Sequence, residues 1–376
     1  MGSIVSDRTQ DVGVKKILVI HPYLTDVLRG SEEVLLKILE ALIERKQDVF
    51  LLGELPSGTI FDDLPLSSIK QIPYGSEADL KPKRFQAYRR YLFLHSKLKD
   101  KLRKEVGKVD IEISTRDTMF LIGAGKKRVA YVHFPENLTR LQNPALNHRW
   151  FWKLFYWPII FQRNRQVKKI DLILCNSNYT QNAILKHWNR EADVVYPPTD
   201  LKDFKPNHKV PLVVTVGCFA PLKNFELVIQ VAKQMPHVKF VIAGRKELND
   251  PYYDKIAVLK PDNVDLNVNV TRTHLSALLG KAKIYLNSCV NEHFGISVVE
   301  AMAAGCIPVV YNNGGPKESI GNYGFLYNNV EECVKVISEA LLSNVDPYDI
   351  AEQAKMFSAD NFKKNFIAAL ERNCLL

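Results

Sequence analysis

The chain is organised around the stretch Asn291–Cys306, which reads NEHFGISVVEAMAAGC. Its two glutamates, Glu292 and Glu300, stand eight positions apart, with the tripeptide FGI at 294–296 just inside the first. The apolar residues that follow predict a buried helix that begins near this tripeptide. The run IPVVY at 307–311 comes next, so the stretch predicts a buried helix followed at once by a strand.

This pattern suits a ligand with a phosphate, a ribose and a sugar. A glycine before a helix lets backbone N–H groups approach a phosphate, and the helix dipole attracts its charge. Glu300, two turns into the helix, can accept hydrogen bonds from the 2′- and 3′-hydroxyls of a ribose, and Glu292 from sugar hydroxyls. The alternative is an ordinary buried helix with two satisfied acids, which the spacing of the glutamates alone does not exclude. The FGI and EAMAAG runs make the pattern far more specific.

Composition favours a globular protein with two domains in a reducing compartment. The chain has 376 residues, 46% hydrophobic and 24% charged, which is too long for one ordinary core and too apolar for disorder. Its six cysteines are scattered without a C-x-x-C pair, which argues for reduced thiols and against a disulfide framework or a zinc site. Residues 1–15 are polar without an apolar signal core, and we expect a flexible leader.

Positive charge is concentrated in the first half of the chain. The net charge is +10, and residues 81–170 contain 22 Lys and Arg against 6 Asp and Glu. A basic segment indicates an anionic partner such as a membrane surface, a lipid phosphate or nucleic acid, with a solvated basic face as the alternative. The aromatic stretch 150–164 is too short and too interrupted to span a membrane. It suits either the membrane–water interface or packing within its own domain.

The first half alternates apolar runs and helical patterns, which predicts an α/β domain with a parallel sheet. The predicted strands are 16–22, 48–52, 109–114, 127–133, 170–175 and 193–196, and the predicted helices are 32–45 and 81–105. Gly30 and Ser31 lie on the loop after the first strand, where a glycine lets the backbone approach a phosphate or sugar. His133 ends a strand, where it could donate to a leaving phosphate or a sugar hydroxyl, although such a lone histidine is more often structural.

The second half repeats this alternation after a polar, proline-bearing linker at 199–210. The predicted strands are 212–217, 238–243, 264–270 and 284–288, and two C-terminal helices are predicted at 348–357 and 361–372. Lys223 opens a helix and could place its ammonium group on a diphosphate; an ordinary surface lysine is the alternative. Arg245 follows the next strand and could make a second phosphate contact.

The motif series resembles that of retaining GT-B glycosyltransferases of family 4. Within that family it is most similar to the dolichol-pathway mannosyltransferases that add α-1,2-mannose to a lipid-linked oligosaccharide. The matching motifs are HPY at 21–23, YVHFP at 131–135, NSNYT at 176–180, VVYPP at 194–198, GCF…KN at 217–224, AGR at 243–245, NEHFGISVVEAMAAG at 291–305 and GGP at 314–316. Their order and spacing cover nearly the whole chain from residue 17.

The resemblance implies two Rossmann-like domains that face each other across a cleft, with the last helix crossing back to the first domain. On this basis the chain divides into a leader (1–15), an acceptor-binding domain (16–198), a linker (199–210), a nucleotide-sugar-binding domain (211–357) and a C-terminal helix (358–376).

The resemblance also implies roles for individual residues. It assigns His133 and Glu292 to the reacting centre, Gly217, Lys223, Arg245, Phe294, Gly295 and Ile296 to the donor diphosphate, Glu300 to the ribose, Val270 to the base, and Gly30 and Ser31 to an acceptor or phosphate loop. Such enzymes retain the anomeric configuration by a same-face displacement in which the leaving phosphate helps deprotonate the acceptor, so no protein base is implied. No D-x-D motif stands at a matching position, so cationic side chains are expected in place of a metal, and no cofactor is expected.

Three departures from the family pattern matter. Cys218 stands where an arginine often follows the glycine, and Ala220 stands where these mannosyltransferases carry one. Stabilisation of the diphosphate therefore depends more on Lys223 and Arg245. The glycine cluster that the family carries on the loop after the first strand is reduced here to Gly30 and the serine after it. The membrane-spanning N-terminal segment of the eukaryotic relatives is missing, so we expect peripheral attachment to an anionic membrane through residues 81–170.

We expect a metal-independent, retaining hexosyltransferase on the cytosolic face of a membrane. In the favoured interpretation it moves mannose from GDP-mannose to a lipid-linked oligosaccharide or glycolipid acceptor. A UDP-sugar and a lipid or soluble acceptor are the first alternative, because the residues that recognise the base are not legible. A non-catalytic basic protein that binds membranes or nucleic acid is the second. Lys223, Glu292 and Glu300 argue against that reading, and no nucleic-acid partner is expected.

Overall fold

The computed structural model describes most of the chain. The described residues are 13–21, 30–55, 61–62, 64–73, 94–116, 118–135, 157, 160–161 and 163–376. The expectations for the leader up to 12, for 22–23 of the HPY motif, for helix 81–93 and for most of 150–164 fall outside these ranges.

The chain forms two compact units. We call residues 1–132, 136–174 and 363–376 the first unit, and residues 133–135 and 175–362 the second unit. Residues 175–198 therefore pack mostly with the second unit, although two short strands at 172–175 and 193–194 extend the sheet of the first. The expected domain boundary at 198 stays a prediction.

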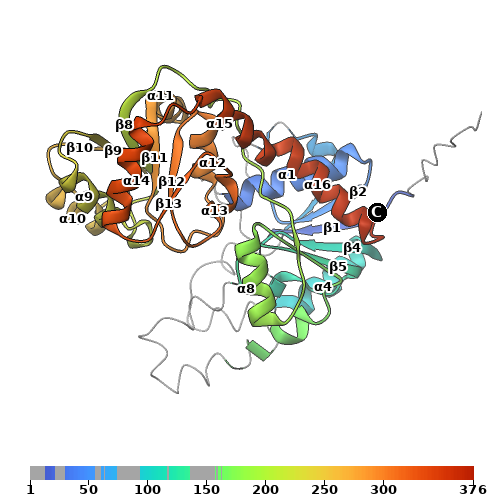
Figure 1. Cartoon of the computed structure of the whole chain (residues 1–376). Coiled ribbons are helices and arrows are strands. Elements are labelled where there is room, and N and C mark those ends of the chain that lie inside the picture. Colours follow the sequence, from blue (N-terminus) through green and yellow to red (C-terminus); the bar gives the residue numbers. More distant parts are fainter. Residues whose placement is uncertain are drawn as a thin grey trace, which may run out of the picture. The chain divides into compact units, whose positions relative to one another are not determined.

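The sheet of the first unit has seven strands in the order β3-β2-β1-β4-β5-β6-β7 (Figure 1). They are β1 (Lys16–Ile20), β2 (Asp48–Leu52), β3 (Ile69–Ile72), β4 (Val109–Ser114), β5 (Gly125–Val132), β6 (Leu172–Cys175) and β7 (Asp193–Val194). Strands β1 to β5 pair in parallel. Ile17, Leu18, Val19 and Ile20 of β1 are fully buried. A central strand of a parallel sheet is covered on both faces, which is why its sequence is a continuous apolar run.

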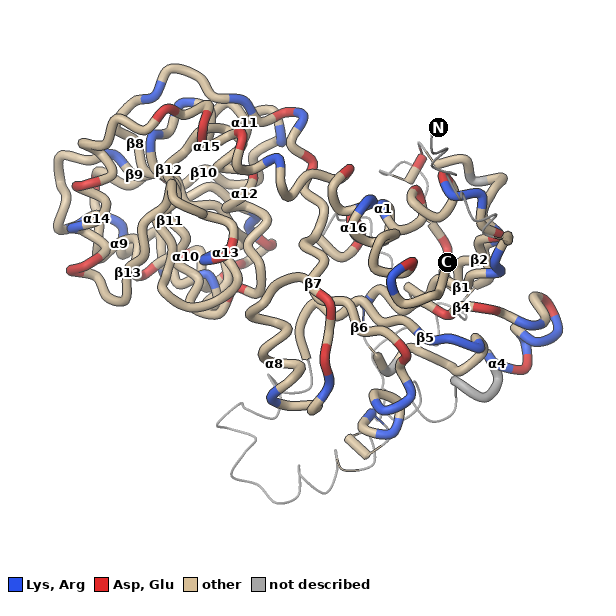
Figure 2. The backbone as a smooth tube through the Cα atoms, turned by 45° about the vertical axis from the view of Figure 1, so that its right-hand side comes forward, with Lys and Arg blue, Asp and Glu red and all other residues tan. Residues whose placement is uncertain are grey.

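The described helices of the first unit include α1, α4 and most of α16, and residues 163–167 are also helical. Helix α1 (Gly30–Glu44) buries eight of its side chains, and α4 (Leu94–Glu105) follows the part of the basic segment that lies outside the described residues. Lys and Arg recur along α4 and the neighbouring β5 (Figure 2). Helix α16 (Ala359–Arg372) begins in the second unit and continues into the first. There Lys363 forms ion pairs with Glu40 and Glu44, and Glu371 pairs with Arg45.

A buried carboxylate fixes the loop that leads into β5. Glu112 of β4 is fully buried, and its two oxygens accept hydrogen bonds from the backbone N–H groups of residues 122–125 at 2.5 to 3.2 Å. Burial raises the pKa of Glu112, while these N–H donors oppose the rise. Gly125 leaves room for the contact, since a Cβ there would lie 2.7 Å from the Cβ of Glu112. The carboxylate thus accepts from four backbone donors, one of them buried and three partly buried.

Replacing Glu112 with glutamine is expected to destabilise the first unit. The amide keeps one acceptor oxygen but turns an NH₂ group toward backbone donors, and each buried donor left without an acceptor costs about 1–3 kcal/mol. Urea unfolding should show a loss of about 2 kcal/mol or more. Asp110→Asn is the matched control in the same strand. Its ion pair with Lys126 is partly exposed, so its loss should stay below about 1 kcal/mol. Equal losses in the two variants would contradict this account.

The sheet of the second unit has six strands in the order β10-β9-β8-β11-β12-β13, all paired in parallel. They are β8 (Val210–Val216), β9 (Lys239–Gly244), β10 (Val264–Val268), β11 (Ala282–Asn287), β12 (Ile307–Tyr311) and β13 (Phe325–Tyr327). The α/β class and the two parallel sheets predicted from the sequence are confirmed.

Helices cover both faces of this second sheet. Figure 1 shows α9 (Phe225–Gln234), α10 (Pro251–Leu259) and α14 (Val330–Leu342) on one face. On the other lie α11 (Arg272–Lys281), α12 (Ile296–Ala303), α13 (Pro316–Ser319) and α15 (Pro347–Ala354). Helix α12 is the helix predicted from the opening stretch. It begins at Ile296 as expected, and five of its eight side chains are buried.

Several short or amphipathic elements were not predicted. Strand β3 reads IKQI with two exposed residues, and β13 has only three residues, so neither gives a clear apolar run. Helices α10 and α14 were also missed. The predicted strand 264–270 ends earlier, at Val268, since Asn269 adopts a left-handed backbone conformation with φ of 52°.

Candidate functional site

The predicted donor residues gather at the carboxyl edge of the second sheet. The loops after β8, β9, β10 and β11 carry Lys223, Arg245, Val270 and Glu292 respectively. Strands β8 and β11 are neighbours at the point where the connections change direction. In open α/β sheets this switch point, beyond the carboxyl ends of the strands, is where ligands bind.

The loop after β8 holds Lys223 in a defined place. Lys223 ends the short 3-10 turn Pro221–Lys223, and its backbone carbonyl accepts a hydrogen bond from Ser288 Oγ at 2.6 Å. Its aliphatic stem lies over Gly217, where a Cβ would come within 3.1 Å of two of the stem carbons. Gly217 therefore gives the lysine stem its space.

Lys223 and Glu292 form an ion pair. Lys223 Nζ lies 2.5 Å from Glu292 Oε2, and each side chain is 21% exposed. Burial alone would lower the pKa of Lys223 and raise that of Glu292, but each partner's charge and their hydrogen bond outweigh burial. The pKa of the lysine is raised and that of the glutamate lowered, so both groups stay charged. The site thus holds a cation and a carboxylate side by side, one suited to phosphate oxygens and the other to hydroxyl groups.

The glycine turn GGP supports the loop that carries Glu292. Gly315 N donates to the carbonyl of Glu292 at 2.9 Å. A Cβ on Gly315 would lie 1.9 Å from the carbonyl oxygen of His293, and a Cβ on Gly314 would lie 2.6 Å from that of Glu292. Only glycines let the two backbones approach this closely.

Gly295 begins α12 with a left-handed backbone. Its φ is 89°, a conformation that favours glycine, and it carries no side chain to accept from the first-turn N–H groups of the helix. An N-terminus of this kind is suited to an acceptor that a ligand supplies, above all a phosphate. Phe294 itself is buried in the core at 3% exposure, so only its backbone can face a ligand.

Glu300 lies on α12 and contacts an arginine that sequence reasoning missed. Arg272 Nη1 donates to Glu300 Oε1 at 3.4 Å. The same guanidinium binds the segment that was expected to be the linker: Nε donates to Asp203 Oδ2 at 2.6 Å and Nη2 to the carbonyl of Asp200 at 2.7 Å. Only the three-dimensional packing brings these four residues together, so the sequence carried no motif for Arg272.

The other two predicted donor contacts differ in exposure. Arg245 follows β9, is 44% exposed and pairs with Glu247 at 3.3 Å. Val270 follows β10, is half-buried and packs against the core of the second unit. Arg245 can therefore reach a ligand in solvent, and Val270 offers an apolar wall.

His133 belongs to the second unit by its packing. Its carbonyl accepts from Thr180 Oγ1 at 3.2 Å, and the adjacent Phe134 stacks on His293 with ring centroids 4.1 Å apart. The carbonyl of His293 accepts from Ser177 Oγ at 2.7 Å. The residues just after β5, His133 and Phe134, and the start of α8 (Asn178–Trp188) thus pack together with the loop that carries Glu292.

His293 is the second site residue that the sequence did not single out. Burial lowers its pKa, and the nearby Lys223 cation lowers it further against the effect of Glu292. The imidazole is therefore neutral at pH 7. The pattern NEHFG contains this histidine, but nothing in it indicates the stack on Phe134.

Gly30 and Ser31 lie in the first unit, at the start of α1. Ser31 Oγ donates to Oε2 of Glu32, whose side chain is buried. Their predicted contact with an acceptor or phosphate stays a prediction.

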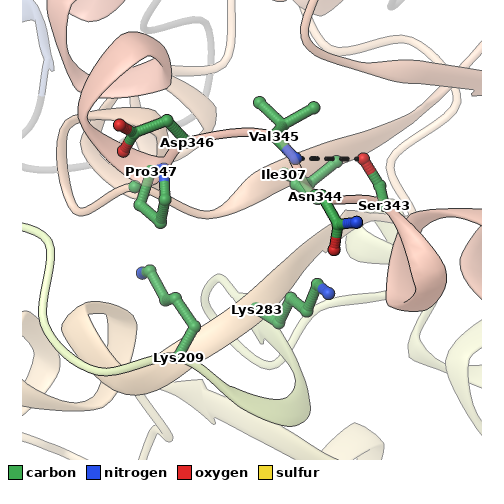
Figure 3. A pocket seen from close by; sticks show the side chains of 9 residues that line it. Lys209, Lys283, Ile307, Ser343, Asn344, Val345, Asp346 and Pro347 are labelled. Atoms are coloured by element: carbon green, nitrogen blue, oxygen red, sulfur yellow. Dashed lines mark hydrogen bonds between the residues drawn. The ribbon is translucent and has the colours of Figure 1, made fainter.

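A cavity of about 440 Å³ lies at the opposite, amino edge of the second sheet (Figure 3). Lys209 and Lys283 line one side of it, across from Asp346 and Pro347. Lys209 Nζ donates to the carbonyls at 279 and 304, and Lys283 Nζ to that at 341. These carbonyls lie at or near the ends of three helices, so the lysines satisfy helix C-termini. They have a structural role here, and the cavity is not part of the donor site.

Two absences concern the described residues alone. They contain no group of three or more His, Cys, Asp or Glu side chains that could hold a metal ion. Within the same ranges, none of the helices combines the length and the apolar character that a membrane span requires.

Two family profiles match consecutive parts of the chain. The profile described as glycosyltransferase family 4 matches residues 28–203, and the profile described as glycosyl transferases group 1 matches residues 198–357. Together they extend over both units.

Curated relatives include the GDP-Man:Man(3)GlcNAc(2)-PP-Dol alpha-1,2-mannosyltransferases of Mus musculus and Xenopus laevis. The mouse protein is 28% identical over 309 residues, which are 68% of this chain and 62% of the relative. The Xenopus protein is 31% identical over 292 residues, 64% of this chain and 60% of the relative. The chain thus spans about three fifths of the length of these two relatives.

Solved structures share the fold at low sequence identity. A sucrose-phosphate synthase from Thermosynechococcus elongatus superposes with a TM-score of 0.73 at 15% identity, covering 95% of this chain and 98% of its own. Anabaena HepE in complex with UDP superposes with a TM-score of 0.68 at 16% identity, covering 95% of this chain and 100% of its own.

Proposed function

Because the chain belongs to the glycosyltransferases that join a family 4 domain to a group 1 domain, we propose that it transfers mannose from GDP-mannose to a lipid-linked oligosaccharide. The donor and acceptor are those in the names of its curated relatives, the alpha-1,2-mannosyltransferases. The observation that carries the proposal is the Lys223–Glu292 ion pair at the carboxyl edge of the second sheet. It joins a phosphate-binding cation to a sugar-binding carboxylate where such folds bind nucleotides.

In the proposed complex the donor diphosphate lies against Lys223 and Arg245. The backbone N–H groups at the start of α12, after Gly295, complete its binding. When the diphosphate arrives, Lys223 shares its charge between a phosphate oxygen and Glu292. Glu300 accepts from the ribose hydroxyls, and Val270 packs against the base.

We propose that the reaction retains the anomeric configuration and requires no protein base. The bond between the anomeric carbon and the donor phosphate breaks, and a bond from the same carbon to the acceptor oxygen forms on the same face. The acceptor hydroxyl proton passes to the leaving phosphate oxygen. Lys223 and Arg245 stabilise the negative charge that develops on the diphosphate, and we propose that these cations take the place of a metal. His133 and Glu292 orient the transferred sugar.

Nucleotide binding tests the donor site. Thermal unfolding is measured with GDP, UDP, GDP-mannose, UDP-glucose and UDP-N-acetylglucosamine, each with and without added Mg²⁺. A ligand at 100 times its Kd stabilises the folded state by about 2.7 kcal/mol, so a bound nucleotide raises the melting temperature clearly. We expect GDP and GDP-mannose to do so without Mg²⁺. If only the UDP species stabilised the protein, the proposed donor would change from GDP-mannose to a UDP-sugar, but the proposed donor site would stand. If no nucleotide stabilised the protein, the proposed donor site would be wrong.

We further propose that the first unit binds the cytosolic face of an anionic membrane. Trp157 and Phe161 are 60% and 51% exposed, and their rings stack with centroids 5.6 Å apart. Exposed cations at 165, 168 and 169 follow them. Exposed aromatic rings beside cations suit the membrane–water interface.

Vesicle flotation tests this surface. We expect binding to phosphatidylcholine vesicles that contain phosphatidylserine and none to phosphatidylcholine alone. The double variant Trp157→Ala, Phe161→Ala should lose most of the binding. Tyr348→Ala, at a 68% exposed aromatic of the second unit, should keep it. Equal binding to both vesicle types would argue against the proposal.

A further inference from the structure

Arg272 occupies a position that neither the motif series nor the family resemblance assigns. It is the first residue of α11, after the N-cap Thr271. Its guanidinium lies 4.9 Å from the centre of the Phe204 ring and is 41% exposed. One face of the guanidinium thus lies over the Phe204 ring, and its edge contacts polar partners.

The nitrogen atoms of the guanidinium contact two different parts of the chain. Nε and Nη2 bind the segment at 200–203: Nε donates to Asp203 Oδ2 at 2.6 Å, and Nη2 lies 2.7 Å from the carbonyl of Asp200 and 3.6 Å from its Oδ2. Nη1 is directed at Glu300, whose side chain is 15% exposed. A planar guanidinium held along its Nε–Nη2 edge in this way presents its Nη1 amino group in a fixed direction.

Charge makes the arginine necessary at this place. Asp200, Asp203 and Glu300 bring three carboxylates around one cation. Removing the guanidinium would leave these three carboxylates without the cation that they share, and Glu300 would lose a hydrogen bond that orients it. A carboxylate that accepts from two adjacent hydroxyls must keep its orientation, since small displacements break one of the two hydrogen bonds.

From this arrangement we infer that Arg272 is a positioning residue that orients the Glu300 carboxylate for the 2′- and 3′-hydroxyls of the donor ribose. The inference rests on the proposed function, because it requires a nucleotide donor. It goes further by making the segment 200–204 part of donor recognition: Asp200, Asp203 and Phe204 set the guanidinium, and the guanidinium sets Glu300. Arg272 itself touches no reacting atom.

A ligand that lacks the hydroxyls separates this role from general stability. Dissociation constants are measured for GDP and UDP and for their 2′,3′-dideoxy forms, with the wild type, Arg272→Ala and Arg272→Lys. For whichever nucleotide the wild type binds, Arg272→Ala should weaken binding about tenfold, as expected for a hydrogen bond to a charged group. With the dideoxy form the same substitution should change binding less than twofold. Arg272→Lys keeps the charge and should restore part of the loss.

Steady-state kinetics provide a second test of the role of Arg272. The ribose contact is remote from the bond that breaks, so it stabilises the ground state and the transition state alike. Arg272→Ala should therefore raise KM for the nucleotide sugar about tenfold and leave kcat within about threefold. Lys239→Ala is the matched control, because Lys239 forms a half-exposed ion pair with Asp265 in the same unit, and it should change neither constant.

The outcomes are distinguishable. Equal weakening of the ordinary and dideoxy nucleotides would mean that Arg272 only stabilises the fold, and no weakening at all would mean that it has no part in binding; either overturns the inference. If the wild type bound no nucleoside diphosphate, the proposed function would fail first. If Arg272→Ala did not fold, the same dissociation constants are measured with Asp203→Asn, which removes the charge of one partner of the guanidinium. This variant should weaken binding of the ordinary nucleotide and not of its dideoxy form.

Discussion

Lys223→Ala is expected to lower kcat/KM for sugar transfer by about 100- to 1,000-fold, the usual cost of removing one preorganised group that stabilises developing charge. Two effects add at this position. The diphosphate loses the cation that the Gly217 and Ser288 contacts hold in place. Glu292 is left mostly buried without its partner, and its charge then repels the diphosphate. Steady-state kinetics and the dissociation constant of the nucleoside diphosphate both measure the loss.

Two further variants make this result specific. Lys255→Ala removes another lysine of the second unit, one whose ion pair with Glu226 spans 2.8 Å, and should leave kcat/KM within about twofold. The double variant Lys223→Ala, Glu292→Gln removes the unpaired charge, so it should regain stability relative to Lys223→Ala but not activity. A Lys223→Ala enzyme that kept more than a tenth of wild-type kcat/KM would contradict the role of this lysine.

Gly315→Ala is expected to abolish nucleotide binding and to lower the melting temperature. A Cβ at this position would lie 1.9 Å from the carbonyl oxygen of His293. That oxygen belongs to the backbone and also accepts from Ser177, so it cannot move aside as a flexible side chain would. The loop from Glu292 to Gly295 must shift instead, at a cost on the order of 3 kcal/mol.

The measurements are thermal unfolding and nucleotide titration on the same preparation. Gly280→Ala is the control in the same unit, because a Cβ there meets its nearest atom, the carbonyl oxygen of Lys205, at 3.2 Å and lies within a helix. It should bind nucleotide normally. If Gly315→Ala bound nucleotide with wild-type affinity, the GGP turn would not support the donor loop.

The sequence predicted the elements of the fold well where burial leaves a clear pattern. Central strands such as β2, β4 and β12 agree with their apolar runs to the residue, because both faces of a parallel strand are covered. Edge strands such as β3 are half exposed and short, so their composition does not separate them from loops. The grouping of residues 175–198 with the second unit depends on packing rather than on pattern, and no sequence signal marks it.

The sequence predicted those residues of the candidate site whose backbone conformation or chemistry requires a particular residue type within a short motif. Gly295 is needed for a left-handed backbone before α12, and Gly315 for a close backbone approach, so both appear as motifs. Arg272 meets its partners across 28 and 69 positions of sequence, to Glu300 and Asp203, and a surface arginine at a helix start has no distinctive context. The Lys223–Glu292 contact spans 69 positions as well, but each member lies in a motif of its own.

The packing of residues 363–376 with the first unit has a consequence for how this protein is made. Phe366 and Leu370 are fully buried, and Lys363 is held by Glu40 and Glu44 of α1. A ribosome adds about 5–20 residues per second, so the stretch from 174 to 363 takes on the order of 10 to 40 s. Throughout that time the nascent first unit lacks its final helix and keeps the apolar surface for it uncovered. The first unit therefore begins to emerge from the ribosome before the second unit, but it is completed only after the second unit has been synthesised.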